Sequence, residues 1–181
     1  TVLGAQQNDN IDIYGDGNNT VELFTGEDNL HIHGDGFNYV DLGDDDDYLH
    51  IEGDVVGGVS TVIAGEGNDS VEIDGGEDNS GNYDIDLGNG DDYLSMYIDG
   101  QQTIDAGEGN DSVQIVGDGY HDIDLGDGND DLYIYGAGIN TNSTRTSIDG
   151  GGGDDYVYIS ENHRLTVDLG EGNDELDIRA D

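Results

Sequence analysis

The chain has 181 residues, of which 44 are acidic and only three are arginine or lysine, so its formal charge is -41 at pH 7 with histidine neutral. A charge this negative argues against nucleic acid and anionic membranes as partners, because both attract basic proteins. Cysteine is absent, so disulfides cannot stabilise the fold. No segment is apolar enough to span a bilayer or to act as a signal peptide, so we expect no membrane insertion.

Low hydrophobicity combined with high net charge is typical of disordered chains, and composition alone leaves disorder open. The residue pattern argues against it. Proline is absent, and 11 tyrosines lie among regularly spaced valine, isoleucine and leucine, which favour strands.

A repeat with a basic period of 19 residues runs along the whole chain. One aspartate marks each copy, and we name these nine residues the anchor aspartates: Asp9, Asp28, Asp47, Asp69, Asp92, Asp111, Asp130, Asp155 and Asp174. They follow one another at intervals of 19, 19, 22, 23, 19, 19, 25 and 19 residues. Three copies therefore carry small insertions, near residues 55–60, 78–83 and 137–146.

Three positions around each anchor aspartate are apolar without exception. In the first copy they are Val2, Ile11 and Ile13, and every later copy has valine, isoleucine, leucine or methionine there. A mixed position separates the second from the third, so apolar and polar residues alternate as in a half-buried strand.

The sequence predicts one all-β domain over residues 1–181, a parallel β-roll or β-solenoid of about nine 19-residue coils. In chain order each coil is expected to run strand, glycine-rich turn with its anchor, strand, and second turn. With two short strands per coil, apolar side chains are buried only when neighbouring coils stack.

The glycine-rich turn before each anchor has a recurring sequence. It reads GEGND at residues 65–69, 107–111 and 170–174, GDGND at 126–130 and GNGDD at 88–92, with variants at 43–47 and 151–155. Glycines let backbone carbonyls converge, and carbonyls with a carboxylate form a hard-oxygen site suited to Ca²⁺ rather than to zinc or copper. We therefore expect a row of Ca²⁺ ions bound by the anchor aspartates and by these turn glycines: Gly65, Gly67, Gly88, Gly90, Gly107, Gly109, Gly126, Gly128, Gly151, Gly153, Gly170 and Gly172.

Stacking the coils also stacks the anchor carboxylates, at a spacing of about 4.8 Å. Each neighbouring pair of charges then repels by about 3.5 kcal/mol at an effective dielectric constant of 20. Folding is therefore expected to depend on bound divalent cations.

Two further polar positions accompany each anchor. Six residues before it lies a second acidic column: Glu22, Asp41, Asp86, Asp105, Asp124, Asp149 and Asp168. The sequence leaves open whether these carboxylates are additional metal ligands or a solvated face. The residue directly before each anchor is always Asn, Asp or Glu, which can bind metal or cap the turn backbone.

These turns resemble the repeats-in-toxin (RTX) family, whose nonapeptide G-G-x-G-x-D-x-U-x is a calcium-binding β-roll signature. Gly65, Gly67, Asp69 and Val71 match its second glycine, third glycine, aspartate and apolar position. The resemblance implies a right-handed parallel β-roll with Ca²⁺ between successive turns. It also implies an extracellular protein, secreted or at the cell surface, that folds when it meets external calcium.

The chain departs from the family pattern in two places. The first glycine is replaced by residues that we expect to extend the apolar core: Leu42, Ala64, Leu87, Ala106, Leu125 and Leu169. At the opposite edge Asn19, Asn38 and His121 occupy the place of the aspartate. We therefore expect one strong Ca²⁺ row, with the other edge weak or empty. The insertions are expected on that other edge, where no ion fixes the loop length.

We expect a structural role and no enzyme, because an active site should break the repeat and supply a cationic group. Only Arg145, Arg164 and Arg179 could supply one, and a carbohydrate-active β-helix is the less favoured alternative. His31 and His50 hold equivalent positions in adjacent coils, so their rings are expected to stack, which leaves a transition-metal pair open.

The repeat rhythm also suggests partners. A second copy laid after Asp181 keeps the 19-residue rhythm with about three residues missing, which favours end-to-end stacking into a fibre, matrix or surface layer. The alternative is a calcium-stiffened segment of a larger secreted adhesin or toxin, with neighbouring repeats as its partners.

Overall fold

The computed structural model describes residues 1–55, 57–76, 80–136, 145–160 and 164–179. These residues form 18 strands and no helix. Accordingly, this part of the chain contains no helix of the length and apolarity needed to cross a membrane.

The strands form two parallel sheets of nine strands each. Sheet A consists of β1 (Val2–Leu3), β3 (Asn19–Glu22), β5 (Asn38–Asp44), β7 (Ser60–Glu66), β9 (Tyr83–Asn89), β11 (Gly100–Asp105), β13 (Gly119–Asp124), β15 (Arg145–Asp149) and β17 (Arg164–Asp168). Sheet B consists of β2 (Asn10–Tyr14), β4 (Asn29–His33), β6 (Tyr48–Glu52), β8 (Ser70–Asp74), β10 (Tyr93–Tyr97), β12 (Ser112–Val116), β14 (Asp131–Tyr135), β16 (Tyr156–Ser160) and β18 (Glu175–Ile178).

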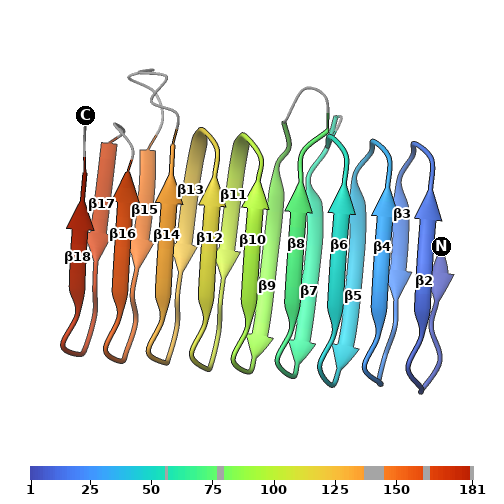
Figure 1. The fold of residues 1–181 in the computed structure, drawn as a ribbon, viewed down its shortest axis with the longest axis horizontal. Coiled ribbons are helices and arrows are strands. Elements are labelled where there is room, and N and C mark those ends of the chain that lie inside the picture. Colours follow the sequence, from blue (N-terminus) through green and yellow to red (C-terminus); the bar gives the residue numbers. More distant parts are fainter. Residues whose placement is uncertain (56, 77–79, 137–144, 161–163, 180–181) are drawn as a thin grey trace.

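Each strand pairs with the equivalent strand of the next coil, in the register that the repeat predicts. Between β4 and β6, for example, Leu30 lies beside Leu49 and Ile32 beside Ile51. The coils follow one another along the long axis of the molecule, with the chain ends at opposite ends of the stack (Figure 1). The predicted all-β solenoid with two short strands per coil is confirmed.

The predicted apolar columns form the core between the two sheets. In the inner coils Leu94, Met96 and Ile104 are 0–1% exposed. The residues that replace the first glycine of the RTX repeat add a fourth buried column, which includes Leu42, Ala64, Leu87, Ala106 and Leu125. Leu169, near the end of the stack, is only partly buried. The predicted extension of the core is therefore confirmed in the inner coils.

The two edges of the solenoid carry different turns. The glycine-rich turns with their anchor aspartates lie at the lower edge in Figure 1, where strands of sheet A lead into strands of sheet B. The insertions lie between β6 and β7, β8 and β9, and β14 and β15, at the other edge, as predicted. Parts of them, residues 56, 77–79 and 137–144, lie outside the described residues.

Candidate metal centre

The anchor aspartates form one column inside the solenoid, along the edge of the glycine-rich turns. Seven of them are only 1–3% exposed: Asp28, Asp47, Asp69, Asp92, Asp111, Asp130 and Asp155. Asp9 and Asp174, in the end coils, are partly exposed. Because aspartate is almost never fully buried unless it is paired, this column needs a compensating partner.

One oxygen of each anchor carboxylate after the first is bound by the backbone of the preceding coil. Asp111 Oδ1 accepts the amide N–H of Asp92 at 2.8 Å, and Asp130 Oδ1 accepts that of Asp111 at 2.8 Å. The same bond recurs from Asp9 to Asp174 with N···O distances of 2.6–3.1 Å. This ladder explains why an acceptor side chain recurs here, but it uses only half of each carboxylate.

The other oxygen, Oδ2, is fully buried and has no hydrogen-bond partner in any of the seven inner anchors. A buried acceptor without a donor costs about 1–3 kcal/mol, and more when it carries charge. Seven such oxygens in one column present a line of bare hard-oxygen ligands. Their chemistry fits a divalent cation that prefers carboxylate oxygen, above all Ca²⁺.

Burial raises the pKa of these carboxyl groups far above the ordinary aspartate value. The pKa rises to about 7 for Asp47, Asp92 and Asp130. It rises to about 6 for Asp69 and Asp111. The ladder hydrogen bond lowers the pKa and neighbouring carboxylates raise it, but the loss of hydration is the largest cause. The column is therefore poorly charged near neutral pH unless a cation compensates it.

The turn glycines are needed because successive turns approach closely. Gly90 and Gly109 have φ angles of 143° and 138°. A Cβ atom at Gly109 would collide with the carbonyl oxygen of Gly90 in the preceding coil. At the glycine two residues earlier in the same turn, the carbonyl of Gly88 accepts the backbone N–H of Glu108 at 2.9 Å. Carbonyls thus fill a cradle that side chains would block, as predicted, while their role as metal ligands stays a prediction.

The second acidic column lies apart from the anchors, on the outer face of sheet A. Residues seven and five places before each anchor point inward, so the residue between them points outward. Most of its members line an open groove of about 820 Å³: Asp41, Asp86, Asp105, Asp124 and Asp149. Glu66, Glu108 and Asp127 of the turns line the same groove. Burial and neighbouring carboxylates raise the pKa of Asp105 and Asp124. The groove is a second acidic row, separate from the anchors.

In the inner coils, from Asp46 to Asp154, the residue directly before the anchor caps the turn backbone of the next coil. Asp91 Oδ1 accepts both the backbone and the side-chain N–H of Asn110, each at 2.8 Å. Asp154 Oδ1 does the same for Asn173, also at 2.8 Å. These bonds lower the pKa of Asp91 and Asp154. Of the two roles that the sequence leaves open here, the structure shows the capping role.

At the opposite edge the column in place of the anchors is buried and carries no carboxylate. Its buried members are Asn38, Ser60, Tyr83, Gln102, His121 and Thr146. Asn19 Nδ2 donates to Asn38 Oδ1 at 2.9 Å, and the backbone N–H of Asn38 donates to Ser60 Oγ at 3.0 Å. The column carries no charge, and its members Asn19, Asn38 and Ser60 bond to one another, so it has no buried charge for a cation to compensate. This is consistent with the predicted single strong row.

A second carboxylate ladder at that edge was missed by sequence reasoning. The Asp54 amide donates to Asp35 Oδ1 at 3.0 Å, and the Asp118 amide donates to Asp99 Oδ1 at 2.7 Å. The signal was the aspartate of the recurring Gly-Asp-Gly triplet, as at residues 34–36 and 117–119. These carboxylates act as turn caps between coils.

The predicted stacking of His31 on His50 is wrong. Their ring centroids lie 5.8 Å apart, but the ring planes are 84° from parallel. The His50 ring is turned so that its Nε2 lies 3.3 Å from Asp74 Oδ2. His31 is instead parallel to His33 of the same strand, within 7°, and Tyr14 stacks on His33 at 4.8 Å.

No family model, no curated protein and no solved structure matches this chain. The RTX resemblance therefore depends on the turn residues alone. The functional argument accordingly starts from the fold and from the buried anchor column.

Proposed function

We propose that this chain is a calcium-dependent structural repeat domain, in which Ca²⁺ ions along the anchor column neutralise buried carboxylates and hold successive coils together. One observation carries the proposal: seven carboxylate oxygens are fully buried without a hydrogen-bond partner. In a chain with a formal charge of -41, a cation is the partner that also reduces the overall repulsion.

The donor set favours Ca²⁺ over softer metals. The anchors and turn glycines offer carboxylate and carbonyl oxygens only, whereas zinc and copper sites in proteins favour imidazole or thiolate. A bound ion would supply positive charge next to Oδ2, while Oδ1 keeps its hydrogen bond to the preceding coil. The anchors would thereby couple ion binding to the stacking of the coils.

Repetition itself supports a structural role. The inner anchors share the same burial, the same ladder bond and the same bare oxygen. A catalytic carboxylate pair normally differs from its surroundings, since an acid and a base need different pKa values. We therefore propose no catalytic activity for the anchor column.

A calcium titration of the full chain, monitored by calorimetry and by circular dichroism, tests the proposal. We expect saturable binding of several ions, with a gain of β-sheet signal that tracks the heat. Magnesium is the control, because it demands a small octahedral shell and gives up its waters reluctantly. An identical response to both ions, or no response to calcium, would contradict the proposal.

We further propose an extracellular setting, because external calcium suits modules that bind it with dissociation constants of about 10⁻⁴–10⁻³ M. In such a setting the chain would stay unfolded until it leaves the low-calcium interior of the cell. The calcium affinity measured in the titration tests this directly, since an affinity far tighter than this range argues for a different compartment.

The end coils expose apolar surface that the inner coils bury. Leu176 and Ile178 are 39% and 46% exposed, whereas Leu132 and Ile134, their counterparts two coils earlier, are fully buried. We propose that a second copy of the chain, stacked end to end, covers this surface; neighbouring repeats of a longer chain are the alternative. Sedimentation velocity should show growth with concentration in calcium and none in chelator. A monomer at every concentration would contradict self-association.

A further inference from the structure

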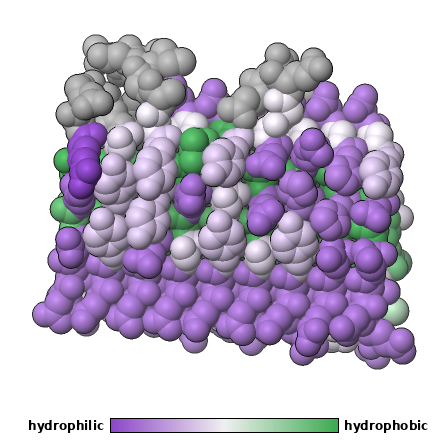
Figure 2. Space-filling view, viewed as in Figure 1, coloured by the Kyte–Doolittle hydropathy of each residue, from purple (hydrophilic) through white to green (hydrophobic). Residues whose placement is uncertain are grey.

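The outer face of sheet B carries two different groups of side chains. Strongly hydrophilic side chains gather over β2, β4 and β6, on the right of Figure 2, and paler ones over β14 and β16. The pale group contains packed tyrosines, Tyr133, Tyr156 and Tyr158. The hydrophilic group contains histidines, which the calcium row does not use.

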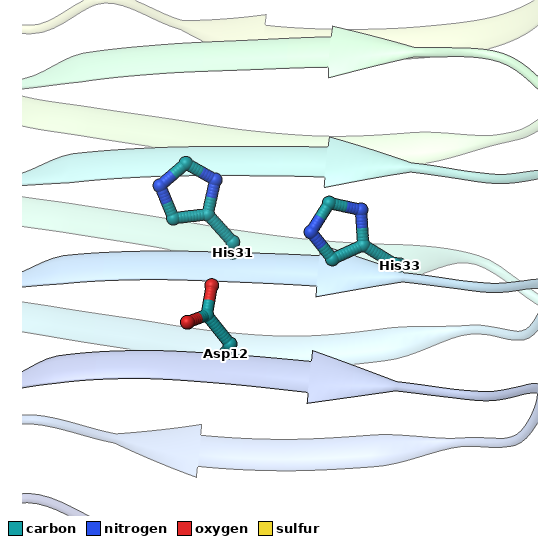
Figure 3. A group of neighbouring side chains, drawn as sticks. All are labelled: Asp12, His31 and His33. Atoms are coloured by element: carbon teal, nitrogen blue, oxygen red, sulfur yellow. The ribbon is translucent and has the colours of Figure 1, made fainter.

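Within the hydrophilic group, three side chains from two neighbouring strands meet. His31 and His33 are two residues apart on β4, so both point to the outer face. Asp12 of β2 lies beside His31 in the strand register. Figure 3 shows one oxygen of the Asp12 carboxylate directed toward His31, with the His33 ring beside His31 on the same strand. One potential ligand atom from each of the three side chains lies within 4.8 Å of the other two.

The surroundings prepare His33 for metal binding. Its Nδ1 lies 3.0 Å from Glu52 Oε2, and an ionised carboxylate can only accept, so Nδ1 donates and Nε2 keeps its lone pair. A carboxylate that holds the far nitrogen of an imidazole is the usual support of a metal-binding histidine. Tyr14 stacks on the same ring at 4.8 Å and limits its rotation.

We propose that Asp12, His31 and His33 form a second metal site, which takes one borderline divalent transition ion such as Zn²⁺ or Cu²⁺. Two imidazoles and one carboxylate suit these ions, whereas Ca²⁺ prefers oxygen ligands only. Zinc bonds of about 2.0–2.2 Å in a tetrahedral shell put ligand atoms about 3.3–3.6 Å apart. Asp12 is exposed and the two histidines are partly exposed, so the side chains can close from within 4.8 Å to that spacing.

This site is independent of the calcium row. The anchor carboxylates lie inside the solenoid, whereas the three ligands lie on its outer face, over the first two coils. Transition-metal binding would therefore add a local cross-link between β2 and β4. It would leave the other coils unchanged.

Calorimetric titration with zinc chloride, in calcium excess so that oxygen-only sites are filled, tests the proposal. We expect one tight Zn²⁺ per chain. His31→Gln and His33→Ser should each weaken it by about tenfold or more. Gln114 holds the position of His31 in a later coil, and Ser160 holds the position of His33 in another. The fold should therefore tolerate both replacements. Copper(II) electron paramagnetic resonance of the unsubstituted chain should show nitrogen coupling from imidazole.

Two matched variants separate the site from general acidity. His50→Gln removes a histidine whose ring touches both others but which is not one of the three ligands. Asp131→Asn removes a carboxylate on the same sheet face, far along the stack. Both should keep the zinc affinity within about threefold, a small change beside the loss expected for a ligand. Unchanged binding in the His31 and His33 variants, equal loss in the His50 variant, or copper spectra without nitrogen coupling would each overturn the assignment.

Discussion

In chelator at about pH 8 and low ionic strength, the chain is expected to lose most of its β-sheet circular dichroism signal, and acidification to about pH 5 is expected to restore part of it. Metal removal leaves the buried anchor carboxylates ionised without a partner. Acid offers them protons instead of calcium.

The stabilising effect of acid follows from the pKa values of the anchor aspartates. An unfolded aspartate has a pKa of 3.8, whereas burial raises the pKa in the folded chain to about 6 for Asp111 and about 7 for Asp92. The folded state therefore binds more protons than the unfolded state between these values. The resulting stabilisation is fully present below pH 3.8 and is lost as the pH rises through about 6–7.

Two controls isolate the anchor column. With excess calcium, the signal should stay nearly constant from about pH 8 to pH 6, because the metal already compensates the charge. Sodium chloride at pH 8 in chelator should restore less signal than calcium, because salt screens exposed charges much better than buried ones. A full signal in chelator at pH 8 and low salt would show that the buried carboxylates tolerate ionisation without a cation, and would remove the basis of the calcium proposal.

Most of the fold follows from the sequence because each coil repeats the same few constraints. An alternation such as Leu94, Ser95, Met96 appears nine times in one register, so each copy supports the same strand assignment. The structure places Leu94 and Met96 in the core, as predicted. The replacement of the first RTX glycine by apolar residues such as Leu87 was also interpreted correctly. An apolar side chain at the end of a strand is expected to join the core, and Leu87 is buried there.

The candidate site was predicted less completely. Residue spacing left open whether Asp105 binds metal together with Asp111. The structure places Asp105 in the groove and Asp111 in the interior. The ladder bond from the Asp92 backbone N–H to Asp111 Oδ1 could not be predicted. Spacing along the chain does not fix where the carboxylate of one coil lies relative to the backbone of the preceding coil. The ring orientations of His31 and His50 depend on contacts such as Asp74, which is remote in sequence from both.

Substituting Asp111→Asn is expected to change stability in opposite directions with and without calcium. In calcium excess, the variant loses a ligand, so the free energy of unfolding in urea should fall by about 1.4 kcal/mol for each tenfold loss in calcium affinity. In chelator, the variant loses a buried charge and should fold at a lower sodium chloride concentration than the parent chain. Circular dichroism measures both effects.

The gain in chelator comes from two opposing contributions. Removing one charge relieves repulsion with the anchors above and below, about 3.5 kcal/mol per pair at an effective dielectric constant of 20. The new amide keeps the bond from the Asp92 N–H, but its NH₂ group replaces the bare Oδ2 and costs about 1–3 kcal/mol if it stays unpaired. The relief of charge repulsion with the two neighbouring anchors exceeds the cost of the unpaired NH₂ group. The substitution is therefore expected to stabilise the metal-free chain.

Two matched variants decide which acidic row holds the ions. Asp105→Asn neutralises the groove carboxylate six residues before Asp111, and Asp122→Asn neutralises an exposed carboxylate on the outer face of sheet A. If the interior row holds the calcium, only Asp111→Asn destabilises the calcium-loaded chain strongly. A larger loss in Asp105→Asn would move the ions to the groove, and equal losses in all three would reduce the effect to net charge. The loss of stability in calcium distinguishes a metal ligand from an aspartate that only caps the turn, because asparagine keeps the capping bond and such a variant would lose little stability in calcium.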